Sequence, residues 1–120
     1  MTLVDTSIWV HHLRRGNDRL RTLLEEGHVL CHPFIVGELA CGSIKNRDEV
    51  LSLLRALPAV TVAEHEEVLD FTHRRQLHGR GLGWIDLHLL ASTILSNAFL
   101  WTTDRRLADA AAEFGKNASA

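Results

Sequence analysis

Short apolar runs alternate along this chain with longer segments of helical periodicity, and this alternation restricts the possible folds more than any other feature. It is typical of an α/β domain whose parallel strands are joined by helices. The chain has 120 residues, the length of one compact domain. We therefore expect a single domain over residues 1–120, with a central, mostly parallel sheet of four to five short strands flanked by helices in three layers.

Apolar spacing, helix caps and chain breakers predict the individual elements. The expected strands cover residues 3–4, 28–32, 60–62 and 99–101. The expected helices cover residues 6–14, 19–26, 33–42, 47–57, 64–77, 85–97 and 104–114. Asp18 is expected to cap the second helix, and Pro33 to occupy the first position of the third. A loop with three glycines is expected at 78–83, and a frayed tail at 115–120.

Four acidic residues occupy places that are unusual for charged side chains. Asp5 and Asp104 each come just after a predicted strand, where ligands of parallel α/β sheets bind. Asp86 lies in the first turn of a strongly apolar helix, where the helix dipole favours a carboxylate. Glu38 has almost only apolar neighbours on its helix. We therefore expect the four carboxylates to converge at one edge of the sheet.

Each acid also has a purely structural interpretation. Asp5 and Asp104 could cap the helices that follow them, and Asp86 could simply interact with the dipole of its helix. Glu38 could be an exposed glutamate on a buried helix. Taken singly, these interpretations are the stronger ones, but four acids at corresponding positions favour a common site.

A carboxylate cluster in a crevice needs an opposing charge, because neighbouring like charges raise each other's pKa. Oxygen ligands alone suit Mg²⁺ or Mn²⁺. With such an ion, the expected chemistry is phosphodiester hydrolysis by an activated water.

The chain carries, in this order, the segments LVDTS at 3–7, EL at 38–39, IDLHLLA at 85–91 and TTD at 102–104. Together they resemble the PIN domain and, more narrowly, the VapC toxins of bacterial VapBC toxin–antitoxin pairs. The resemblance covers nearly the whole chain. It implies a metal-dependent endoribonuclease toxin that is neutralised by a VapB-like antitoxin, and relatives form dimers or larger complexes with that antitoxin.

The resemblance also implies roles for individual residues. Asp5 and Asp86 would be the principal ligands of one or two Mg²⁺ or Mn²⁺ ions, and Glu38 and Asp104 would complete the acidic pocket. Three hydroxyl residues stand where the family holds the acids or the water, namely Thr6, Ser7 and Thr102. Two departures concern the end of the chain: residues 115–120 make a poor fifth strand, and Asp109 reads as helix surface where many relatives carry a further acid.

Basic residues give a weaker indication of an RNA-binding surface. Arg80 in the glycine loop, and Arg105 and Arg106 beside Asp104, are placed to contact RNA phosphates. The net charge of −2 means that any such contact must come from a local patch. Apolar positions taken as exposed, such as Trp9, Leu53 and Leu57, predict a homodimer.

Two other functions compete with the nuclease. A haloacid-dehalogenase-like phosphatase would need an Asp-x-Asp pair, but Asp5 is followed by Thr6 and Ser7. A non-catalytic module that regulates its operon together with an antitoxin would not need four intact acids.

The other potential ligands and aromatic residues have structural interpretations. The eight histidines lack the spacing of a zinc helix, so we interpret them as satisfied surface or core residues. Trp9 and Trp84 could stack on bases, but packing in the core or at an interface is the preferred interpretation. Cys31 and Cys41 are interpreted as buried thiols of a reducing cytosol. The sequence contains no signal peptide or membrane span, which predicts a cytoplasmic protein.

Overall fold

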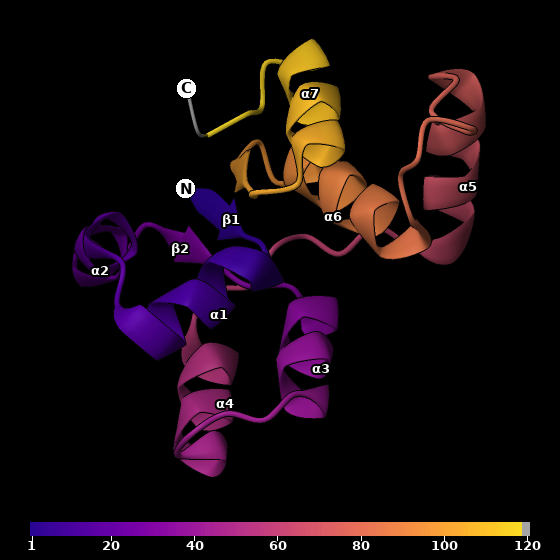
Figure 1. Cartoon of the computed structure of the whole chain (residues 1–120). Coiled ribbons are helices and arrows are strands. Elements are labelled where there is room, and N and C mark those ends of the chain that lie inside the picture. Colours follow the sequence, from indigo (N-terminus) through magenta and orange to yellow (C-terminus); the bar gives the residue numbers. More distant parts are fainter. Residues whose placement is uncertain (119–120) are drawn as a thin grey trace.

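A computed structural model describes residues 1–118 and confirms the α/β class (Figure 1). The strands are β1 (Thr2–Val4), β2 (Val29–Leu30) and β3 (Phe99–Trp101). The helices are α1 (Thr6–Arg15), α2 (Asp18–Glu25), α3 (Pro33–Cys41), α4 (Arg47–Ala56), α5 (His65–Arg74), α6 (Trp84–Leu95) and α7 (Arg105–Glu113).

The sheet is parallel, as predicted, with the strand order β2-β1-β3. Its centre is fully buried, since Leu3, Val4 and Leu100 are all 0% exposed. In Figure 1, α5, α6 and α7 lie together on the side of β3, and α3 and α4 form a pair on the side of β2. No helix among residues 1–118 is long and apolar enough to cross a bilayer.

The strand predicted at residues 60–62 does not form. Backbone pairing with the end of β2 is limited to one parallel bridge between Cys31 and Ala59. Two backbone amides that follow donate to serine side chains of α6 and its C-cap. The Thr61 N–H donates to Ser96 Oγ at 2.8 Å, and the Ala63 N–H donates to Ser92 Oγ at 3.0 Å. Side-chain acceptors on the helix therefore replace a neighbouring strand.

The tail predicted to fray at 115–120 is held against β3 as far as the structure describes it. The Leu100 N–H donates to the Lys116 carbonyl at 2.7 Å, and the Ala118 N–H donates to the Leu100 carbonyl at 3.0 Å. A parallel bridge joins Leu100 to Asn117. An open edge of β3 carries unpaired backbone groups, and the tail satisfies them despite its poor strand composition. Residues 119–120 lie outside the described part of the chain.

Three smaller expectations are also wrong. Asn17, not Asp18, caps α2, because its side chain accepts from the Leu20 N–H at 2.9 Å. Cys41 is exposed, whereas Cys31 is buried as predicted. Trp9 is only 4% exposed and belongs to the core, so of the positions taken as exposed only Leu53 is fully so.

Candidate active site

Asp5 lies where the two central strands end, and its carboxylate joins them. The Asp5 N–H donates to the Trp101 carbonyl at 2.9 Å, which extends the β1–β3 pairing by one residue. Asp5 Oδ1 accepts from the Thr6 N–H at 2.7 Å, and Asp5 Oδ2 accepts from the Thr102 hydroxyl at 2.7 Å. Asp5 therefore caps α1 and is also fixed from the end of β3.

The neighbouring Thr6 connects this carboxylate to Glu38. The Thr6 hydroxyl donates to Glu38 Oε1 at 2.8 Å and so joins the first turn of α1 to α3. Glu38 is exposed, and Leu39 beside it is buried. The glutamate thus lies on the solvent side of α3, whose Ile35 and Leu39 face the core.

Asp104 is held beside the same threonine. The Asp104 N–H donates to Thr102 Oγ1 at 3.1 Å, so the Thr102 side chain contacts both acidic residues. Asp104 Oδ1 caps α7 by accepting from the N–H groups of Arg106 and Leu107 at 2.9 and 3.3 Å. Ser7 Oγ accepts a long bond of 3.5 Å from the Thr103 N–H, so all three predicted hydroxyl residues lie in this network.

Asp86 approaches from α6. Its Oδ2 accepts from the Gly83 N–H at 2.9 Å, which fixes the side chain over the start of the helix. Burial raises the pKa of Asp86, and the negative charges of Asp104 and Asp5 raise it further, against the opposing effect of the Gly83 hydrogen bond. Asp104 and Asp5 therefore lie close enough for their charges to act on Asp86.

The structural and the functional interpretations of the acids are compatible. Asp5, Asp86 and Asp104 all satisfy helix N-termini. Among the described residues, Asp86 Oδ1, Asp104 Oδ2 and Glu38 Oε2 nevertheless have no hydrogen-bond donor. Each of these carboxylates keeps an oxygen that another group can use.

This donor set fits a hard divalent cation in its chemistry. Within residues 1–118, however, no group of three or more His, Cys, Asp or Glu side chains lies close enough together to hold a metal ion by itself. Mg²⁺ keeps several waters and needs only one or two direct carboxylates, so a loosely spaced acidic set is compatible with it.

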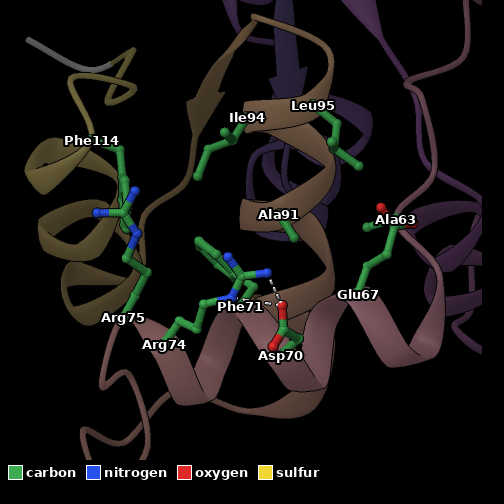
Figure 2. A pocket seen from close by; sticks show the side chains of 10 residues that line it. All are labelled: Ala63, Glu67, Asp70, Phe71, Arg74, Arg75, Ala91, Ile94, Leu95 and Phe114. Atoms are coloured by element: carbon green, nitrogen blue, oxygen red, sulfur yellow. Dashed lines mark hydrogen bonds and ion pairs between the residues drawn. The ribbon is translucent and has the colours of Figure 1, made fainter.

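Glu38 borders an open hollow, whereas Asp5 and Asp86 are half-buried. Thr6 and Glu38 form part of the wall of a cavity of about 700 Å³ between α1, α3 and the 42–46 loop. A second groove, of about 330 Å³, lies between α5 and α6 and reaches Phe114 (Figure 2). None of its lining residues in the described chain belongs to the acidic set, so the two hollows are separate.

The three arginines predicted to bind RNA have different surroundings. Arg80 forms an ion pair with Glu113 of α7, which raises the pKa of Arg80 and lowers that of Glu113. Arg105 and Arg106 are exposed in the first turn of α7. Arg106 lies against Gly81, where an added Cβ would come within 2.6 Å of the guanidinium, so the glycine permits this close packing.

The sequence predicted that all histidines have hydrogen-bond partners, and two buried ones, His32 and His88, do not fully meet this prediction. His32, 1% exposed, caps α3 by accepting from the Phe34 N–H at its Nδ1, 2.9 Å away. In the described residues, His32 Nε2 and His88 Nδ1 have no hydrogen-bond partner. The position of His32 directly before Pro33 was the one sequence signal that could have identified it as a cap.

His32 makes stability depend on pH. Burial, together with the neighbouring His88, lowers the pKa of His32 to about 4, from an ordinary value of 6.5. The unfolded chain binds this proton as the pH falls through 6.5, whereas the folded chain does not until about 4. We therefore expect a free energy of unfolding that is complete above pH 6.5 and falls by up to about 3 kcal/mol toward pH 4.

Urea unfolding at pH 7 and pH 5 measures this effect, and His32→Asn is the matched variant, because asparagine keeps the cap but does not titrate. The pKa of His88 is also lowered by burial, so the variant should lose part of the pH dependence and not all of it. An unchanged difference between the two pH values in His32→Asn would contradict the assignment.

Comparison with known proteins agrees with this geometry. The PIN domain family matches residues 2–113. Ribonuclease VapC32 of two strains of Mycobacterium tuberculosis, CDC 1551 / Oshkosh and H37Rv, is 52% identical to this chain over 116 residues. The aligned region covers 96% of this chain and 94% of either relative. The chain therefore belongs to the PIN domain family and, within it, to the VapC proteins.

Proposed function

We propose that this protein is an endoribonuclease that hydrolyses RNA phosphodiester bonds with Mg²⁺ or Mn²⁺ held by its four acids. The observation that carries the proposal is that Thr102 contacts both Asp5 and Asp104 at the ends of β1 and β3, with Asp86 near enough for their charges to act on it. Burial and, to a smaller extent, these two charges raise the pKa of Asp86, and a bound cation would favour its ionised form. The similarity to proteins named ribonuclease supplies the substrate class.

In this proposal the hydrogen bonds of the site determine what each residue does. Asp5 and Asp86 are the principal ligands, and Glu38 and Asp104 complete the pocket directly or through water. Thr102 and Thr6 orient the carboxylates of Asp5 and Glu38. A bound Mg²⁺ or Mn²⁺ would supply Lewis-acid polarisation of the phosphate and a water of lowered pKa.

Cleavage of a labelled single-stranded RNA in Mn²⁺ buffer tests the proposal. We expect the wild-type protein to cut the RNA internally and Glu38→Gln to cut far more slowly, because Gln still accepts from Thr6 but lacks the charge. Equal cleavage by both proteins would contradict the role of the glutamate. The absence of cleavage by the wild type, on RNAs of several folds, would favour a binding module instead.

We further propose neutralisation by a VapB-like antitoxin. The cavity beside Thr6 and Glu38 is lined by apolar residues of α1 and α3, including Val10, Leu13 and Leu39. A partner segment lying in it would end next to the acidic pocket, where a basic side chain could block the carboxylates.

We also propose a homodimer, joined by antitoxin into a heterotetramer or larger complex. Exposed apolar side chains support it: Leu53 is 62% exposed on α4, Leu69 is exposed on α5, and Leu95 is exposed and lines the groove in Figure 2. Sedimentation at micromolar concentration should give twice the mass of the 13.5 kDa chain. A monomeric mass, with and without antitoxin, would contradict the assembly.

A further inference from the structure

Aromatic rings from three helices form a continuous row beside the acidic residues. The ring centroids of His32 and Phe34 at the start of α3 are 4.9 Å apart, and those of Phe34 and His88 are 4.8 Å apart. His88 lies 4.6 Å from Trp84 on α6, and Trp84 lies 5.0 Å from His65 at the start of α5. The row thus joins the beginnings of α3, α5 and α6.

The middle ring of the row, His88, is buried, whereas its neighbours Phe34 and Trp84 are exposed. His88 is 5% exposed and packs edge-to-face against both Phe34 and Trp84, at interplanar angles of 62° and 85°. Phe34 and Trp84 are 36% and 37% exposed. Ile85, next to Trp84, is equally exposed, so this is a patch and not an isolated apolar residue. The packing fixes the two rings while leaving part of each open to a ligand.

The exposed rings lie on the same helices as two of the proposed catalytic carboxylates. Phe34 and Glu38 are four residues apart on α3, which places them on one face of the helix. Trp84 follows Gly83 directly, and the Gly83 N–H holds the Asp86 carboxylate at 2.9 Å. A polymer whose phosphate lies at the acids would therefore pass over Phe34 or Trp84 with its neighbouring nucleotide.

We propose that Trp84, packed against His88, stacks on an unpaired base of the RNA next to the phosphate at the acids. This inference rests on the nuclease function proposed above and adds a residue that would contact a base of the substrate. A flat ring can bind any unpaired base, because every base has a π-face, but it cannot reach a base that is stacked inside a duplex.

The charge of the chain favours this mode of binding. The net charge is −2, and Arg80 is paired with Glu113, which leaves Arg105 and Arg106 as the predicted contacts to phosphates. Stacking supplies affinity that does not depend on net charge. A protein partner could also cover these rings, and the test below separates the two occupants.

The probe is a fluorescently labelled, mixed-sequence 12-nucleotide RNA, single-stranded or annealed to its complement, with anisotropy measured in EDTA. We expect wild type to prefer the single strand and Trp84→Leu to bind it about 5- to 100-fold more weakly. Trp84→Phe keeps a π-face and should restore most of the affinity. Phe99→Leu, which removes an exposed ring at the start of β3, is the matched control and should bind like wild type.

Tryptophan emission provides a second readout. Trp9 and Trp101 are 4% and 7% exposed, so RNA should quench mainly Trp84, and the quenching should disappear in Trp84→Leu. Equal affinity of wild type and a folded Trp84→Leu, equal affinity for duplex, or no binding by wild type would overturn the inference. A changed oligomeric mass with unchanged RNA affinity would assign the rings to a protein interface.

The two proposals fail in different ways. Trp84-dependent binding without metal-dependent cleavage would remove the nuclease and leave the stacking site. Normal cleavage by Trp84→Leu, with an unchanged KM and unchanged binding, would remove the stacking site and leave the nuclease.

Discussion

Replacing Asp86 with asparagine is expected to slow RNA cleavage by about 100-fold or more, because losing a metal ligand removes several kcal/mol of transition-state stabilisation. The same change should leave the metal-free protein as stable as the wild type or more stable. Burial and the charges of Asp104 and Asp5 disfavour the ionised Asp86 carboxylate, and a neutral amide removes that cost. Asparagine can still accept from the Gly83 N–H, so the start of α6 keeps its cap.

Melting curves in EDTA and single-turnover cleavage in Mn²⁺ measure the two effects separately. Asp109→Asn is the matched control, since it makes the same charge change on the exposed face of α7. It should cleave like wild type. If Asp86→Asn melts at a lower temperature and still cleaves normally, Asp86 is only a structural residue.

Removal of divalent metal should abolish cleavage, and Mg²⁺ or Mn²⁺ should restore it. The four acids and the three hydroxyl residues of the site offer oxygen ligands, and none of them carries a positive charge that could replace the cation. A bound cation would supply the Lewis acid and the water of lowered pKa, so EDTA should suppress the chemistry. The measurement is the rate of cleavage of a labelled RNA in EDTA, followed by titration with each metal.

A trace of contaminating nuclease is the main confounding factor in this experiment. Asp86→Asn, purified in the same way, provides the background rate. Full wild-type activity in EDTA, above that background, would exclude the mechanism.

Much of the fold could be predicted because its determinants are local. Apolar periodicity located the seven helices of the described residues, and Pro33 marked the start of α3 through its own backbone preference. The failures involve partners distant in the sequence. Ser92 and Ser96 accept hydrogen bonds from the amides that would have extended a strand near residue 60. Residues 116–118 pair with the edge of β3. Neither interaction leaves a trace in the local sequence.

The candidate site shows the same division. Asp5 and Asp104 could be placed at one edge because parallel strands end together, and the structure joins both to Thr102. The link from Glu38 to Thr6 spans 32 residues and depends on how α1 packs against α3. The ring row through His88 was not predicted, because it needs side chains from three helices to meet.

The four acids are proposed to form one cation site. Calorimetric titration of the metal-free protein with Mn²⁺ measures binding at this site without RNA or cleavage. We expect Mn²⁺ to bind the wild type saturably and to bind Asp86→Asn at least about tenfold more weakly. The melting temperature of the wild type should rise with the Mn²⁺ concentration, because the ion binds the folded protein. Asp109→Asn should bind like wild type. Equal Mn²⁺ affinity in wild type and Asp86→Asn, or no binding to the wild type, would contradict the account.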